Sequence, residues 1–323
     1  MNKLLIICGP TATGKTLLAI TLAKKFDGEI ISADSRQVYK GMNIGTGKDL
    51  PENAKLQMTD NGFGFYEIDG IPVWGYDLAD PKEEFSVSKY LKFAPKIISD
   101  IDGRGRLPIL VGGTGLYIKG VVDGIPTADV PRSMELREKL LGKSPDELFE
   151  TLSQTDTLKA GSMNTSDRKN PRRLMRAIEV SQYFLDHRNK ESQLLAIDKR
   201  DTMFIGLTAP RDFVDRGIEE RVERRVRDGI KDEIKNLLDS GVDWNDQSML
   251  SLGYRQYRDF FEGGVGEELI IDEWTREEKR YAKRQMTWFK KDRRILWFDV
   301  SDSKFSEKVE KSVKKWYKST YDE

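Results

Sequence analysis

The chain has 323 residues, enough for two domains that each bury a core of their own. Its 54 lysines and arginines equal its 54 aspartates and glutamates, so any basic surface for nucleic acid must be local. One cysteine, Cys8, and one histidine, His187, exclude a disulfide framework and a Cys/His zinc cluster. No apolar run is long enough for a signal peptide or a membrane span, so we expect a cytoplasmic protein that does not contact a membrane.

Short apolar runs alternate with turns and helical patterns along much of the chain. Residues 4–7 predict a buried strand, and residues 16–26 carry apolar side chains at helical spacing. Three further runs predict strands: residues 29–32, 107–111 and 203–207. Residues 50–80 are rich in Gly, Asn and Asp and predict an irregular excursion or a hairpin. Strands that alternate with helices favour a parallel sheet flanked by helices, with ligands at the carboxyl ends of the strands.

The segment between the first strand and the first helix has the pattern GxxxxGK[ST]. It consists of Gly9, Pro10, Thr11, Ala12, Thr13, Gly14, Lys15 and Thr16. In this context backbone N–H groups and the helix amino terminus attract phosphate oxygens, Lys15 adds a full positive charge, and Thr16 is a ligand for Mg²⁺. We therefore predict a site for a diphosphate or triphosphate. The strands at 107–111 and 203–207 do not end in the aspartate that many P-loop NTPases use to hold magnesium.

The strand signal is lost between the predicted strands at 107–111 and 203–207. Three stretches there have helical patterns: residues 132–141, 145–152 and 171–185. We expect a P-loop NTPase-like α/β core made of residues 1–121 and 200–323, which ends in a helical segment. Residues 122–199 are expected to form a helical insertion domain.

Five ordered blocks together carry a family resemblance. They are residues 9–16, residues 34–48, Gly112-Gly113-Thr114-Gly115-Leu116-Tyr117, Gly253-Tyr254-Arg255-Gln256 and Arg284-Gln285-Met286-Thr287-Trp288-Phe289. In these blocks the chain resembles the tRNA dimethylallyltransferases, also called tRNA isopentenyltransferases. The resemblance implies transfer from dimethylallyl diphosphate to N6 of adenosine 37 in tRNAs that read codons beginning with U. Diphosphate and N6-(dimethylallyl)adenosine would be the products.

The chemistry of these residue types agrees with that reaction. An exocyclic adenine amine is a weak nucleophile, so a carboxylate that takes its proton as the C–N bond forms would help. Asp34 is the candidate base, although an aspartate at this place can also cap a turn or hold Mg²⁺ through water. The resemblance places Thr114 near the reacting centre, where the alternative role is a helix N-cap. Lys15, Thr16 with Mg²⁺ and the loop amides would stabilise the diphosphate leaving group.

The acceptor base must leave the anticodon-loop stack to reach such a site. The resemblance assigns contacts with the base and the tRNA to Asp34, Ser35, Arg36, Gln37, Arg172, Arg173, Arg176, Gly253, Tyr254, Arg255, Gln256, Lys283, Arg284, Gln285, Trp288 and Lys290. Gln37 can offer a donor and an acceptor to an adenine edge. The basic residues among them could contact phosphates, although basic faces are often only solvated and the aromatic residue can belong to the core.

One segment departs from the family pattern. Relatives usually carry an arginine immediately before an isoleucine in this region, whereas here Gly217 precedes Ile218. Arg216 is one residue away, which on a helix is a rotation of about 100°. Arg221 is a second candidate for the contact with the leaving group. The chain also lacks the cysteines and histidines of the C2H2 zinc finger that eukaryotic relatives often append, so a prokaryotic-type enzyme is expected.

Three other functions remain open. An adenylate isopentenyltransferase would prenylate free AMP, ADP or ATP, and the basic carboxyl-terminal segment argues against it. A P-loop kinase or NTPase would be expected to carry the missing strand-end aspartate. A catalytically idle RNA-binding protein is the third alternative.

Overall fold

The computed structural model describes residues 2–187 and 200–319, which fall into two compact units. The α/β unit comprises Met1–Asp123 and Asp198–Glu323, and the insertion unit comprises Gly124–Ile197. Residues 188–199, part of the predicted insertion, lie outside the described residues. No helix in the described ranges is long and apolar enough to cross a membrane.

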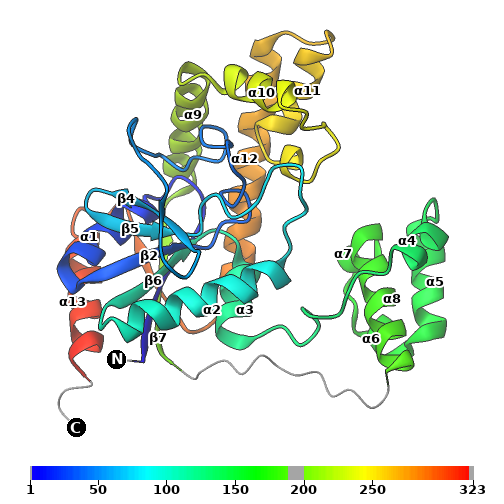
Figure 1. Cartoon of the computed structure of the whole chain (residues 1–323), viewed down its shortest axis with the longest axis horizontal. Coiled ribbons are helices and arrows are strands. Elements are labelled where there is room, and N and C mark those ends of the chain that lie inside the picture. Colours follow the sequence, from blue (N-terminus) through cyan, green and yellow to red (C-terminus); the bar gives the residue numbers. More distant parts are fainter. Residues whose placement is uncertain (1, 188–199, 320–323) are drawn as a thin grey trace. The chain divides into compact units, whose positions relative to one another are not determined.

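An eight-stranded sheet lies at the centre of the described α/β unit (Figure 1). Its strands, in spatial order, are β3 (Gln57–Met58), β4 (Gly64–Ile68), β5 (Ile71–Trp74), β2 (Gly28–Ser32), β6 (Leu107–Gly112), β1 (Lys3–Cys8), β7 (Asp201–Thr208) and β8 (Ile295–Asp299). Every neighbouring pair from β5 to β8 is parallel, while β4 runs antiparallel to both β3 and β5. The predicted parallel sheet is confirmed, and the β4–β5 hairpin lies in the predicted excursion. The sequence analysis did not find β8.

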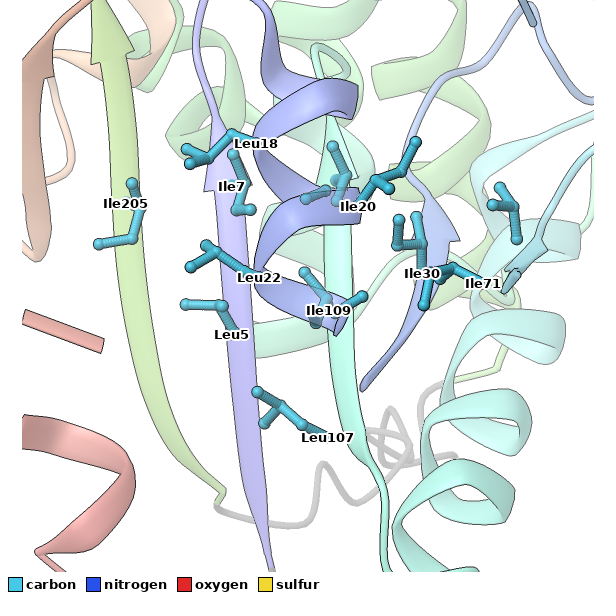
Figure 2. Packing of buried hydrophobic residues seen from close by; sticks show 14 of the residues in the cluster. Leu5, Ile7, Leu18, Ile20, Leu22, Ile30, Ile71, Leu107, Ile109 and Ile205 are labelled. Atoms are coloured by element: carbon cyan, nitrogen blue, oxygen red, sulfur yellow. The ribbon is translucent and has the colours of Figure 1, made fainter. Parts of the chain in front are cut away.

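Helices follow the strands and cover the sheet. In the α/β unit they are α1 (Lys15–Phe26), α2 (Val87–Gly103), α3 (Gly115–Asp123), α9 (Arg211–Arg227), α10 (Ile230–Asp239), α11 (Tyr254–Phe261), α12 (Glu267–Phe289) and α13 (Phe305–Lys318). Figure 2 shows Leu18 and Leu22 of α1 facing Ile7, Ile109 and Ile205 on the sheet. Every residue of β1 is buried, which explains why its sequence after Lys3 is a continuous apolar run and does not alternate.

The insertion unit has a helical core of its own. Its helices are α4 (Met134–Leu140), α5 (Pro145–Thr155), α6 (Thr157–Ser162), α7 (Thr165–Arg168) and α8 (Pro171–Asp186). Leu148 and Leu152 of α5 pack with Leu174 and Ile178 of α8, and all four side chains are buried. Ser144 and Glu147 form a capping box that fixes the start of α5. The three predicted helices are confirmed.

Candidate active site

Residues 9–16, the predicted phosphate loop, connect β1 to α1 as their sequence predicts. Gly9 has φ 139°, and a Cβ there would lie 2.5 Å from the carbonyl oxygen of Leu207 in β7, so only glycine fits. Gly14 has φ 74° and precedes α1 in a left-handed conformation. Lys15 Nζ donates to the Pro10 carbonyl at 2.6 Å, which folds the side chain back over the loop. The loop thus presents the amino terminus of α1 and one ammonium group together.

A cavity of about 920 Å³ opens beside this loop. It lies where β1, β2 and β6 end, the edge of a parallel sheet at which ligands bind. Eight lysine and arginine side chains line the cavity against four aspartates and glutamates. This local excess of positive charge suits a polyanion, although the whole chain is neutral.

Burial and the neighbouring charges alter the pKa of Lys15. Its pKa is lowered to about 8, chiefly by burial and then by the neighbouring Arg221 guanidinium, while Asp34 acts in the opposite direction. No salt bridge to this ammonium group is recorded among the described residues.

Asp34 follows β2 and reaches the cavity from the opposite side of the loop. It is half-buried, and its Oδ1 accepts a hydrogen bond of 2.8 Å from the backbone N–H of Arg36. This bond forms a turn, one of the alternatives that the sequence left open. The second oxygen, Oδ2, is left for other partners.

Thr114 fixes the segment that carries Asp34. Its backbone N–H donates to the Ala33 carbonyl at 3.1 Å, and its Oγ1 accepts from the backbone N–H of Ser35 at 3.0 Å. The hydroxyl is thus bonded across to the residues after β2. Its bonding partner is not an amide of α3, as an N-cap role would require.

The two arginines of α9 that were predicted to contact the leaving group differ in whether they line the cavity. Arg216 is exposed, donates through Nε to the Asp212 carbonyl at 3.3 Å and does not line the cavity. Arg221 lines the cavity and donates through Nη1 to the hydroxyl of Thr11 in the phosphate loop. Of these two candidates, Arg221 lies at the cavity beside the loop and Arg216 does not.

Comparison with known protein families shows which enzymes are similar to this chain in sequence. A family model described as IPP transferase matches residues 37–292, and a model described as isopentenyl transferase matches residues 2–63. The chain belongs to the IPP transferase family. A tRNA dimethylallyltransferase of Geobacillus thermodenitrificans is 39% identical and aligns over 96% of this chain and 94% of its own length. Its counterpart in Anoxybacillus flavithermus is 37% identical over 95% and 93%.

Solved structures of IPP transferases have the same fold. The full-length tRNA isopentenylpyrophosphate transferase from Bacillus halodurans aligns with a TM-score of 0.68 and 35% identity, over 98% of this chain and 97% of that one. A eukaryotic dimethylallyltransferase described as acting on tRNA aligns with a TM-score of 0.74 and 26% identity, over 93% of this chain and 74% of that one.

Burial corrects several tRNA contacts that the resemblance to the IPP transferases suggested. Gly253, Tyr254 and Gln256 are buried: the Tyr254 hydroxyl donates to Glu233 Oε1 at 2.5 Å, and Gln256 Oε1 accepts from the Gly253 N–H at 2.9 Å. Of this block only Arg255 is exposed. Three of its residues therefore support the fold and have no free surface for tRNA.

The side chains of two glutamines also form hydrogen bonds within the protein. Gln285 is buried, accepts from the Thr11 N–H at 2.9 Å and donates to the Gly113 carbonyl at 3.1 Å. Gln37 lines the cavity, but its amide accepts from the Ser32 hydroxyl at 2.7 Å and donates to the Gly47 carbonyl at 2.9 Å. Both glutamines also line the cavity, so their predicted contacts with the base or the tRNA stay predictions, and each side chain already holds part of the surrounding backbone.

The remaining predicted tRNA residues are placed at accessible sites. Lys283, Arg284, Trp288 and Lys290 are exposed on and just after α12, while Ser35 and Arg36 line the cavity. In the insertion unit Arg172 and Arg173 are exposed at the start of α8. Arg176 is half-buried and donates to the carbonyls of Thr127 and Val130, each at 2.8 Å.

Arg225 is one of several cavity residues that were not predicted from the sequence. It lines the cavity from the buried side of α9, with 4% of its surface exposed. The i, i+4 spacing from Arg221 was the available signal, because it puts both side chains on one helical face.

Proposed function

We propose that the protein transfers the dimethylallyl group of dimethylallyl diphosphate to N6 of adenosine 37 in tRNA. The observation that carries this proposal is one cavity lined by the phosphate loop, Asp34 and Arg221. A polyanion site and a carboxylate base are the two parts that such a transfer needs. The strands β6 and β7 do not end in the aspartate that many P-loop NTPases use to hold magnesium, which argues against a kinase.

The proposed reaction breaks the allylic C–O bond and forms a C–N bond to the adenine. The electron pair of the C–O bond passes to the diphosphate, where Lys15, the loop amides and Arg221 would stabilise the negative charge as it develops. Asp34 would accept the N6 proton through Oδ2, because Oδ1 already holds the turn. Thr114 would keep Asp34 in place by binding the Ser35 N–H.

The residues of the cavity could hold Mg²⁺ only if the diphosphate supplied further ligands. The described residues contain no group of three His, Cys, Asp or Glu side chains that could hold an ion. Mg²⁺ commonly takes one or two protein oxygens and completes its shell with phosphate and water. Thr16 would hold the ion, which when bound neutralises charge on the diphosphate.

The acceptor would be an adenosine of the anticodon stem-loop. Enzymes that modify a base inside a stack must first turn it out, and a single-stranded loop lowers that cost. The exposed cations on α8 and α12 supply candidate phosphate contacts. Because its one cysteine, Cys8, is buried and free, we place the reaction in the cytoplasm.

Labelled donor tests the proposal directly. Purified protein is incubated with radiolabelled dimethylallyl diphosphate, Mg²⁺ and either tRNA with an unmodified, adenosine-rich anticodon loop or free AMP. We expect label in the tRNA at adenosine 37. Label in AMP with none in tRNA would overturn the proposal in favour of an adenylate isopentenyltransferase.

A further inference from the structure

Three residues of α9 face the cavity at intervals of four. Gly217, Arg221 and Arg225 therefore form one stripe along the helix. At the first of these positions a Cβ would lie 3.3 Å from the Cβ of Ala12, so the helix passes tightly over the phosphate loop there. This is also the place where the family resemblance leads us to expect an arginine. The chain has no cation at that end of the stripe, but it has two further along.

Arg225 is buried without a full set of partners. Its Nη1 lies 3.3 Å from Glu278 Oε1, and its guanidinium lies 5.8 Å from the ring centre of Trp274. Its Nε has no hydrogen-bond partner among the residues that the structure describes. An unsatisfied donor on a charged, buried side chain is costly, so a further acceptor is to be expected.

The guanidinium groups of Arg225 and Arg221 approach each other beneath the backbone of Gly47. A Cβ on Gly47 would collide with the Nη2 atoms of both arginines. Burial lowers the pKa of Arg225 to about 10, and the charge of Arg221 contributes in the same direction, against a smaller opposing effect of Glu278. Two like charges held together in this way favour an anion with more than one charge.

We propose that Arg225 binds the diphosphate leaving group together with Arg221 and supplies the cation that Gly217 cannot. The inference rests on the proposed function for the identity of the ligand. As the C–O bond breaks, its electron pair moves onto the diphosphate oxygens, and the N–H groups of both arginines donate to that charge. Arg225 thus lowers the barrier to departure as well as binding the donor.

Magnesium pyrophosphate is the probe for this assignment, because it isolates the leaving group from the tRNA. We compare the wild type with Arg225→Met and with Arg211→Met, a control that removes an exposed arginine from the same helix outside the cavity. Titration calorimetry measures affinity and thermal melting verifies the fold. Arg225→Met is expected to weaken pyrophosphate binding by about 10-fold or more and to lower kcat, while the control matches the wild type.

A double variant separates this role from a structural one. If Arg225 only neutralises Glu278, then Arg225→Met/Glu278→Gln would fold and bind pyrophosphate like the wild type, which would overturn the proposal. We expect the double variant to bind as weakly as Arg225→Met, and it decides the matter if the single variant does not fold. The proposed function can fail separately, through label in AMP alone, without changing the pyrophosphate result. Wild-type pyrophosphate affinity in either folded variant, alongside wild-type labelling of tRNA, would remove only the role of Arg225.

Discussion

The carboxylate of Asp34 already accepts one hydrogen bond inside the protein, from the Arg36 N–H at 2.8 Å. An asparagine keeps an oxygen for that bond but cannot take a proton from an amine. We therefore predict that Asp34→Asn lowers the single-turnover rate of prenyl transfer by about 100-fold or more and leaves tRNA affinity unchanged. A filter-binding assay beside the rate measurement checks both halves. Full activity would remove Asp34 from the mechanism, and a parallel loss of tRNA affinity would make its role structural.

Lys15 gives the donor site a predicted pH dependence. Its pKa is lowered to about 8, chiefly by burial and then by Arg221, so the ligand-free protein loses this charge as the pH rises through 8. We expect pyrophosphate affinity to fall across that pH. The ligand-free folded state should in turn gain stability from this group as the pH rises above 8, because an unfolded lysine keeps its proton up to its ordinary pKa of 10.5.

Titration calorimetry at several pH values on either side of 8 measures the effect. The matched variant is Lys15→Met, which removes the charge at every pH. Any change in the ionisation of pyrophosphate itself affects both proteins equally, so the difference between them reports Lys15. Equal pH dependence in the two proteins would show that Lys15 does not titrate in this range.

The arginines of α9 show what the sequence could decide at this scale. The helix carries six of them: Arg211, Arg216, Arg221, Arg224, Arg225 and Arg227. Sequence reasoning chose Arg216 because it lies next to Gly217, and Arg221 as a second candidate. Helical phase decides instead: Gly217, Arg221 and Arg225, each four positions apart, line the cavity, and Arg216 does not. The resemblance named the right segment, but only the packed helix shows which side faces the cavity.

At the scale of elements, prediction succeeded where burial is complete. The strands β1, β2 and β6 are buried along their whole length, so apolar residues make up most of their sequences. The buried charged exceptions, Lys3 and Glu29, are paired with Asp201 and Arg104. The edge strand β8 was missed because it is only partly buried and directly follows the basic pair Arg293 and Arg294. Sequence patterns do not separate a half-exposed edge strand from an aromatic, basic surface segment.

The link between α12 and the phosphate loop carries a prediction of its own. Within the described residues, Gln285 is the only side chain with hydrogen bonds to both the Thr11 N–H and the Gly113 carbonyl. Replacing it with leucine leaves a buried N–H and a buried carbonyl unsatisfied. We expect Gln285→Leu to lower the free energy of unfolding by roughly 2 kcal/mol or more and to weaken pyrophosphate binding.

Urea unfolding and calorimetry provide the measurements for Gln285. The control is Thr287→Ala, which removes an exposed hydroxyl that bonds to the Lys283 carbonyl of the same helix, and it should match the wild type. Reduced tRNA affinity at unchanged stability would instead support the original expectation that Gln285 contacts tRNA.

At the scale of the whole molecule, the two units divide the proposed work. The cavity for the diphosphate is lined entirely by residues of the α/β unit. Arg172, Arg173 and Arg176, predicted to contact tRNA, belong to α8 in the insertion unit. Each unit also has a separate hydrophobic core. Donor binding and part of tRNA binding should therefore respond to different mutations.

A matched pair of core substitutions tests this division. Leu152 and Leu5 are both fully buried, the first in the core of the insertion unit and the second in that of the α/β unit. Leucine-to-alanine changes at such sites cost about 2 to 5 kcal/mol. We predict that Leu152→Ala lowers tRNA affinity while pyrophosphate affinity stays at the wild-type value, because the damage is confined to one unit. Leu5→Ala should lower both. If Leu152→Ala reduced the two affinities equally, the units would depend on each other for folding, and the cations of α8 could not be credited with a separate role.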